Sequence, residues 1–413
     1  MTPFEIAAGF ACLVAAVGWL NSRFFDLPTE IAMVLAGVGG AALLLAGRAF
    51  GVLPDAVARA LDTVRGVDFS RAVLGYLLAF LLFAGAMQVD LTELRRRRLS
   101  VWSLATLGVL GSTFLVGGGL WAAAQALGID LPLVWALVFG ALISPTDPIA
   151  VLAVVRRGSL SKALQAVLQG EALFNDGVGI VVFSAAVVMA GGHDVAPLHA
   201  VVQVIVAAGG GLLLGLAASL AAVRAMRAID DYAVEVTITI ALAMAVYTFA
   251  QALQLSGAIA VVAAGLIVGD RSADAAMSET TRQYVRAFWT LVDEGLNAVL
   301  FLMLGLQLAI VSLDLRHAGL WLAAIVLTLI VRFAVVWPWG AFFRRRLDEH
   351  GATPILAWGG LHGALSLALA LSVPASTSRD LLLSITFVVV LFSVVVQGLT
   401  FPVLVKRLAR TGG

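Results

Sequence analysis

Long runs of apolar residues, separated by short polar segments, recur along the whole chain. A helix needs roughly 20 mostly apolar residues to cross a bilayer, and thirteen stretches of the sequence fit that template. The pattern therefore predicts an all-α, multi-pass membrane protein, a single transmembrane unit. The predicted spans are residues 4–21, 27–47, 70–89, 100–126, 131–155, 164–190, 197–223, 232–250, 253–269, 290–312, 317–343, 353–373 and 381–405.

Two of the polar connections are long enough to carry structure of their own. Residues 51–66 have the spacing of an amphipathic connector, and residues 270–289 are predicted to be a longer polar linker or an interfacial helix. The first residues, MTPFEIAAGF, lack a basic region and a cleavage site of small residues. We therefore expect them to begin the first span rather than to form a signal peptide.

The composition agrees with a membrane protein. The 413 residues are 61% hydrophobic and 12% charged, whereas soluble domains are about 45–50% apolar and about 25% charged. A net charge of +1 gives no indication of nucleic-acid binding, and the single cysteine excludes an intramolecular disulfide.

The basic residues predict the orientation, because cytoplasmic loops are enriched in Lys and Arg. An N-terminus outside and a C-terminus in the cytoplasm, with an odd number of spans, place most of the 26 Lys and Arg residues on the inner side. The inner set is Arg23, Arg95 to Arg98, Arg156, Arg157, Lys162, Arg224, Arg227, Arg271, Arg282, Arg286, Arg344 to Arg346, Lys406, Arg407 and Arg410.

Two spans carry signals of a local interruption. In ALISPTDPIAVLAVV, Pro145 and Pro148 bracket Thr146 and Asp147, and each proline removes a backbone donor and disturbs the preceding turn. In PILAWGGLHGALSLALALSVP, three glycines lie close together. Interrupted spans at corresponding positions of two halves indicate a transporter's binding site. We expect an inverted repeat of spans one to six and eight to thirteen.

The span that contains GEALFNDGVGIVVF places acids at membrane depth, where each charge is costly. Glu171 and Asn175 are four residues apart and share a helix face, with Asp176 beside them. Arg332 is the one basic residue that the predicted topology places deep inside a span. We expect Arg332 to pair with Glu171, which leaves Asp176 as the working group.

These residues suggest a mechanism. Burial disfavours the charged form of a carboxyl group, and either a proton or a small cation held by oxygen atoms relieves that cost. If the two ligands compete for Asp176, and if the empty, charged site changes from one side of the membrane to the other only poorly, cation/proton exchange follows. Because Asn175 is neutral where a second acid would add charge, we hypothesise electroneutral one-for-one exchange by alternating access.

The motifs SPTDPIAV and GEALFNDGVGIV resemble those of the bacterial NhaP-type sodium/proton antiporters and their eukaryotic NHE relatives. The resemblance extends to FLLFAGAMQVDLTELRRRR and NAVLFLMLGLQL. It implies the NhaA/NapA-like transporter fold, with two crossed broken helices, in the bacterial inner membrane. It further implies a homodimer surrounded by lipid, with no cofactor and no enzymatic activity. The dimerisation part would be about 4–89 and 197–312, and the ion-transport core about 100–190 and 317–405.

The resemblance also implies roles for individual residues. Asp176 would bind the cation and the proton, with Asn175 beside it, and Thr146 and Asp147 would help to coordinate Na⁺. Glu171 would pair with Arg332.

Two positions depart from the family pattern. Ala172 stands where a serine is common, and His362 stands in place of an arginine. Histidine can lose its charge between about pH 5 and 8, so His362, with Ser144, is a candidate for tuning pH response or selectivity; an equal alternative is that His362 only packs.

Other functions stay open at this stage. Na⁺ or Li⁺ is the expected cargo, but K⁺ or an organic cation such as a polyamine is the alternative. A cation channel is a further alternative from a different class. No nucleophile–base pair or metal motif of adequate spacing favours an enzyme.

Overall fold

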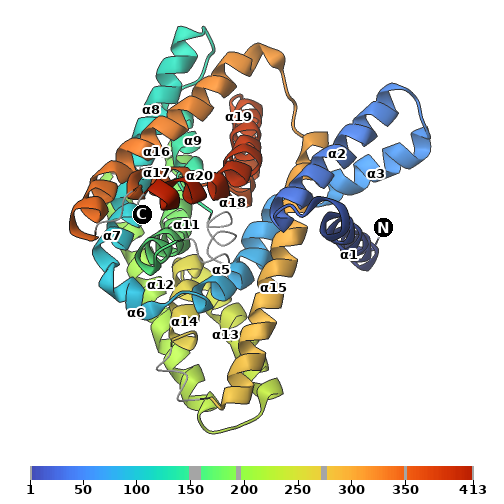
Figure 1. The fold of residues 1–413 in the computed structure, drawn as a ribbon. Helices are drawn as coiled ribbons and strands as arrows, with labels where there is room; N and C mark the ends of the chain where they lie inside the picture. Colours follow the sequence, from blue (N-terminus) through green and yellow to red (C-terminus); the bar gives the residue numbers. More distant parts are fainter. Residues whose placement is uncertain (1, 148–159, 192–196, 271–276, 348–350, 412–413) are drawn as a thin grey trace.

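The computed structural model describes residues 2–147, 160–191, 197–270, 277–347 and 351–411. Within these ranges the chain folds into a bundle of helices (Figure 1), and its one strand-like feature is an isolated pairing of Asp147 with Leu361. Ten helical segments in the described parts are long and apolar enough to cross a bilayer. The prediction of an all-α, multi-pass membrane protein is therefore confirmed.

The ten long segments follow the predicted spans closely. Short π-helical turns interrupt three of them, and another ends the first. In chain order they are α1–η1 (Pro3–Leu20, Asn21–Phe25), α2 (Thr29–Ala49), α4–η2–α5 (Phe69–Ala72, Val73–Leu77, Leu78–Met87), α7–η3–α8 (Arg98–Ser103, Leu104–Gly108, Val109–Ala126), α11 (Lys162–Ala190), α12 (Pro197–Met226), α13 (Tyr232–Ala252), α15 (Glu279–Leu306) with η5 (Gln307–Ala309), η6 (Leu315–His317) with α16 (Ala318–Leu347), and α19–η7–α20 (Arg379–Phe392, Ser393–Gln397, Gly398–Thr411).

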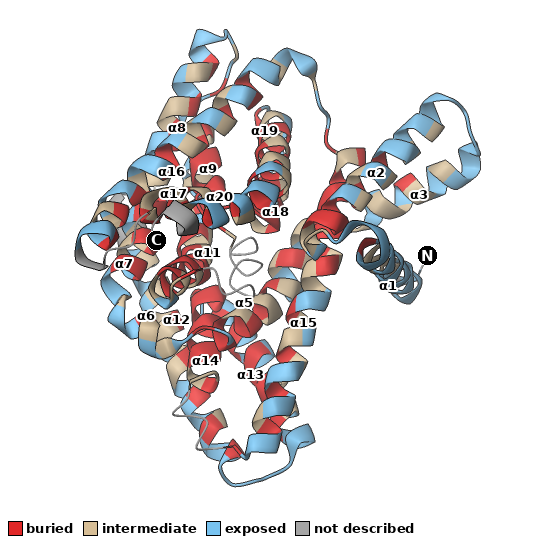
Figure 2. Cartoon of the chain, viewed as in Figure 1, coloured by how far each residue is buried: buried red, intermediate tan, exposed pale blue. Residues whose placement is uncertain are grey.

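The three remaining predicted spans are shorter helices. They are α9 (Leu133–Ile143), α14 (Gly257–Val268) and the pair α17 (Ala352–Trp358) and α18 (Ala364–Ser372). Figure 2 shows that α9, α14 and α18 are buried among the longer helices. A short helix leaves unpaired backbone groups at membrane depth, which only a protein or wet environment can satisfy. Their position inside the bundle therefore allows these helices to be short.

The connections are partly as expected. Residues 54–66 form the predicted amphipathic helix, α3 (Pro54–Gly66), of which only Leu61 is buried. The prediction of a polar linker up to residue 289 is wrong, because α15 already begins at Glu279 behind an N-cap, Ser278. Only one face of this first part is apolar, and its residues Val285 and Trp289 are buried against the rest of the protein. A hydropathy average over both faces therefore misses the helix. A further short helix, α6 (Leu91–Arg96), follows α5.

The two interrupted spans meet inside the bundle. The backbone N–H of Asp147, in the non-helical segment after α9, donates a hydrogen bond of 2.7 Å to the carbonyl of Leu361, in the break between α17 and α18. This bond supplies partners for two backbone groups that the unwinding had left free. The predicted break at the glycines is confirmed, and the part of the first span from Pro148 onward lies outside the described residues.

Helices α1, α2 and α3 project to one side of the bundle (Figure 1). Only 6% of the residues in the most apolar stretch of the first span, which contains α1, are buried inside the protein. Helix α2 packs on α15. The division into a dimerisation part and a transport core stays a prediction.

Close helix contacts in this bundle depend on small residues, as in other membrane proteins. Gly117 of α8 faces α9 so closely that an added Cβ would lie 2.8 Å from Leu137 Cα and 2.9 Å from the Ala136 carbonyl oxygen. At the next residue, Gly118, an added Cβ meets nothing within 4 Å.

We expect Gly117→Ala to destabilise the protein by about 1–3 kcal/mol, the usual cost of forcing a methyl group into a packed interface. Gly118→Ala is the matched control and should not lower stability. The melting temperatures of the two detergent-purified variants measure the difference. Equal melting temperatures would show that the α8–α9 contact does not need the glycine.

Candidate ion-binding site

Helix α11 supplies the acidic motif of the site. The helix runs 29 residues from its N-cap, Ser161, and places Glu171 and Asn175 inside the protein, with exposed fractions of 2% and 1%. Asp176, one position on, is only half-buried. The three polar groups therefore have different surroundings although they lie within two helical turns.

Glu171 is neutralised by an arginine from another helix. Arg332 of α16 forms a two-pronged ion pair, with Nη1 on Oε1 of Glu171 and Nη2 2.9 Å from Oε2. Nη2 also donates a 3.0 Å hydrogen bond to the carbonyl of Leu356 in α17. The pair thus links α11, α16 and the first half of the broken span, and it uses both oxygens of Glu171.

Asn175 connects α11 to the other interrupted span. Its Nδ2 donates a 2.8 Å hydrogen bond to Oγ1 of Thr146. Its Oδ1 is buried and has no hydrogen-bond partner among the described residues. An unsatisfied buried oxygen is costly, so this atom is available to a cation or a water molecule.

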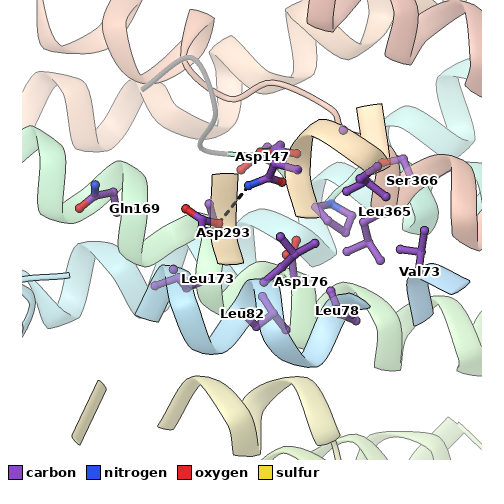
Figure 3. A pocket seen from close by; sticks show the side chains of 18 of the residues that line it. Val73, Leu78, Leu82, Asp147, Gln169, Leu173, Asp176, Asp293, Leu365 and Ser366 are labelled. Carbon is purple, nitrogen blue, oxygen red and sulfur yellow. Dashed lines mark hydrogen bonds between the residues drawn. The ribbon is translucent and has the colours of Figure 1, made fainter. Parts of the chain in front are cut away.

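Asp147 and Asp176 line one cavity of about 100 Å³ beside this junction (Figure 3). Both aspartates are half-buried. The other lining residues are Val73, Leu78, Leu81, Leu82, Gly85, Gln88, Val89, Pro145, Thr146, Gln169, Ala172, Leu173, Asp293, Asn297, Leu300, Gly363, Leu365 and Ser366. The predicted Asp176, Asp147 and Thr146 are therefore brought together at a single cavity.

The two interrupted segments are held tightly around Asp147. A Cβ added to Gly363 would lie 2.9 Å from Cγ of Asp147, and one added to Gly179 would lie 3.1 Å from Cδ of Pro145. Glycine at these positions lets the second break and α11 approach the first break at van der Waals distance.

His362 and Ser144 lie behind the site. Nδ1 of His362 is 3.2 Å from the carbonyl oxygen of Pro145, and its backbone N–H donates a 2.8 Å hydrogen bond to Oγ of Ser393. The hydroxyl of Ser144 donates to the Ala141 carbonyl at 2.8 Å. Neither residue lines the cavity in the part of the chain that the structure describes. His362 and Arg332 instead border a small space of about 10 Å³.

The site also contains polar residues that the sequence did not single out as site residues. Asp293 of α15 accepts a 3.0 Å hydrogen bond from Gln88 Nε2 on one oxygen and a 3.0 Å bond from Asn297 Nδ2 on the other. All three line the cavity. They lie near span ends, where solvated polar residues are common, so sequence position alone did not distinguish them. Ser366 also lines the cavity.

A second, polar cavity of about 310 Å³ adjoins the first and shares Gln88 and Val89 with it. It is lined by residues at the end of α5, after α14 and in the first turns of α15, among them Asp90, Asp270 and Thr290. Gln88 and Asp90 are exposed. The shared residues place the two cavities next to each other, with the polar one at this surface.

The donor set suits a hard monovalent cation better than a resident metal. The carboxylate, hydroxyl and amide groups around the cavity offer oxygen atoms, which hard cations prefer. No group of three or more His, Cys, Asp or Glu residues that could hold a metal ion occurs in the described ranges.

Polar groups at the meeting point of interrupted membrane helices define a secondary transporter. The sequence matches the family described as sodium/hydrogen exchanger, transmembrane, over residues 11–407. The chain therefore belongs to the transmembrane sodium/hydrogen exchanger family, and the resemblance inferred from its motifs is confirmed.

Individual relatives are similar over nearly their whole length. The Na(+)/H(+) antiporter NhaP of Pseudomonas aeruginosa is 38% identical over 410 residues, which cover 98% of this chain and 96% of that protein. The Na(+)/H(+) antiporter NhaH of Halobacillus aidingensis is 34% identical over 388 residues, 92% of this chain and 94% of that protein. The structure of the sodium proton antiporter MjNhaP1 from Methanocaldococcus jannaschii at pH 8 matches with a TM-score of 0.74 at 20% identity, over 99% and 100% of the two chains.

The buried ion pair yields a stability prediction. Arg332→Met leaves the Glu171 carboxylate buried without its counter-charge, which typically costs about 3–5 kcal/mol. We expect the double variant Glu171→Gln with Arg332→Met to recover part of this loss. Thermal unfolding in detergent measures both.

The surface pair Arg282–Glu279, at 3.0 Å with Glu279 71% exposed, is the matched control. Glu279→Gln should cost no more than about 1 kcal/mol, because water screens such pairs. A loss for Arg332→Met as small as that of the control would contradict the structural importance of the pair.

Proposed function

We propose that this protein exchanges a monovalent cation, Na⁺ or Li⁺, for H⁺ across a membrane. The observation that carries the proposal is the cavity where the two interrupted spans meet. Three carboxyl groups line it, the half-buried Asp147 and Asp176 and the hydrogen-bonded Asp293, while Glu171 on the same helix as Asp176 is neutralised by Arg332. The relatives named above are Na(+)/H(+) antiporters, which agrees with this activity.

The chemistry of exchange follows from competition at Asp176. A carboxylate in a poorly hydrated site is stabilised either by a proton or by a cation with oxygen ligands. Asp147, Thr146 and the unpaired Oδ1 of Asn175 lie near enough to complete such a ligand set around the junction. When the cation leaves, a proton takes its place, and the neutral or cation-loaded site crosses more easily than the empty charged one.

The charge count favours electroneutral exchange. Asn175 is neutral and its amide is bonded to Thr146, so Asp176 is the one acid of the α11 motif without an arginine partner. One titrating acid that exchanges one cation for one proton moves no net charge in a full cycle.

The route from the polar cavity suggests which side is open. Gln88 follows the end of α5, on the side that the distribution of Lys and Arg assigns to the cytoplasm, and it lines both cavities. On the opposite side, Val73, Leu78 and Leu365 give the cavity an apolar lining. We therefore assign the structure to a cytoplasm-facing state of an alternating-access cycle in a bacterial inner membrane, with the N-terminus outside and the C-terminus inside.

A homodimer is the proposed assembly. Helix α1 exposes large apolar side chains along much of its length, including Phe4, Leu13 and Trp19. Lipid or a second copy of the chain can cover them, and Figure 2 shows that the projecting arm of α1 to α3 is largely exposed.

Transport in sealed vesicles tests the proposal. The purified protein is reconstituted with a pH-reporting dye, and Na⁺, Li⁺, K⁺ or a polyamine is added in turn. We expect Na⁺ or Li⁺ to trigger proton movement that persists when an ionophore clamps the membrane voltage. Asp176→Asn, which keeps the shape but cannot exchange its proton, should abolish the movement.

Three outcomes separate the alternatives. A response to K⁺ or a polyamine alone would replace the cation but keep the exchange reaction. A voltage-driven current without proton flux would identify a channel. Full cation-coupled proton flux in Asp176→Asn would refute competition at this residue.

We further propose that His362 shapes the pH response. The ring contacts the Pro145 carbonyl, one residue from Thr146, and shares a small space with Arg332. Histidine changes its charge between about pH 5 and 8, whereas arginine stays charged. His362→Arg places a permanent positive charge beside Arg332 and the site, and we expect the dependence of the transport rate on pH to change.

The matched control for this variant is His317→Arg, which changes a histidine in η6 before α16. It should leave the pH profile unchanged. If His362→Arg also leaves the profile unchanged, His362 has only a packing role.

A further inference from the structure

Ser366 has an unusual hydroxyl group. The residue is 1% exposed and lines the cavity that contains Asp147 and Asp176. Its Oγ has no hydrogen-bond partner among the described residues. A buried hydroxyl without a partner is costly, so a ligand that occupies the cavity is expected to contact it.

The break in the span explains why this hydroxyl is free. Serine in a helix usually donates to a backbone carbonyl three or four residues earlier. Ser372, in the last turn of the same helix, does so at 2.7 Å to Leu369. For Ser366 the corresponding residues are His362 and Gly363, which precede the first turn of α18. The interruption thus removes the usual acceptor from the helix.

Ser366 lies on the wall of the same cavity as the two carboxylates. Gly363 lies directly against the Asp147 side chain, and Ser366 follows it by three residues, one helical turn further on the same face. Figure 3 shows Ser366, Asp147 and Asp176 around the cavity. Ala172 lines this cavity too, but its methyl group offers no oxygen.

We propose that Ser366 supplies a ligand oxygen to the transported cation, in the place that Ala172 leaves without one. The inference rests on the proposed exchange function and deepens it. A neutral hydroxyl coordinates a partly dehydrated cation through its dipole but adds no charge. It therefore favours the cation over the proton at Asp176, since a proton on that carboxyl needs no further ligand, and it leaves the charge balance of the cycle unchanged.

Ser366→Ala tests this assignment. We expect the KM for Na⁺ and Li⁺ to rise about tenfold, the change that corresponds to a loss of about 1.4 kcal/mol. At a fixed cation concentration the proton should compete more strongly at Asp176, so the inhibition at low pH should begin at a higher pH than in the wild type. Ser372→Ala, which removes a hydroxyl of the same helix that is bonded to Leu369, is the matched control and should leave the KM unchanged.

Moving the hydroxyl group to another wall of the cavity makes the test more specific. Adding Ala172→Ser to Ser366→Ala restores an oxygen to the cavity wall from α11, and the KM should return toward the wild-type value. Binding can be followed without transport through the rise in melting temperature on adding Na⁺, because a ligand that binds only the folded protein stabilises it. Should Ser366→Ala fail to fold, Ser366→Thr and Ser366→Val make the same comparison.

The outcomes separate a failure of the Ser366 assignment from a failure of the proposed exchange function. If the wild type shows no cation-dependent proton movement, the proposed function itself fails. If the wild type exchanges and Ser366→Ala keeps its KM, the hydroxyl contacts only water and the inference is overturned. An equal loss in cation and proton binding would also overturn it, because that pattern indicates a structural role.

Discussion

The cost of a charge at membrane depth is the constraint on which this structure depends. Three acids lie on or beside the junction of the two interrupted spans, and the protein treats them differently. Glu171 accepts hydrogen bonds from both Nη atoms of Arg332, and Arg332 also donates to the carbonyl of Leu356 in α17. Since this pair joins three helices, it fixes the framework in which Asp147 and Asp176 remain half-buried at a cavity.

The interruptions of the two spans serve the same end. Unwinding frees backbone groups, and the bond from Asp147 to Leu361 satisfies two of them where the segments meet. The same unwinding leaves the hydroxyl of Ser366 without its usual carbonyl acceptor. Breaks that would be a defect in an ordinary membrane helix thus concentrate unsatisfied oxygen atoms around one point. A cation can be held there without a permanent counter-charge.

Access to this point is built from a different set of residues. Asp293 of α15 accepts hydrogen bonds from Gln88, which follows α5, and from Asn297. All three line the carboxylate cavity, and Gln88 also lines the polar cavity nearer the surface. The binding groups come from α11 and the interrupted spans, whereas the route comes from α5 and α15.

The sequence by itself determined the all-helical, multi-pass class and the break at the glycines. It also singled out the residues Thr146, Asp147, Glu171, Asn175, Asp176 and Arg332, which lie around the junction of the interrupted segments. These are properties of local composition: apolar length, proline and glycine in a span, and a charge where none is expected. It could not show that Glu279 already begins α15, because one polar face lowers the average hydropathy. It could not single out Ser366 or Gln88 either. Serine and glutamine are ordinary at such positions, and only the tertiary structure decides which hydroxyl has lost its acceptor and which polar groups share a cavity.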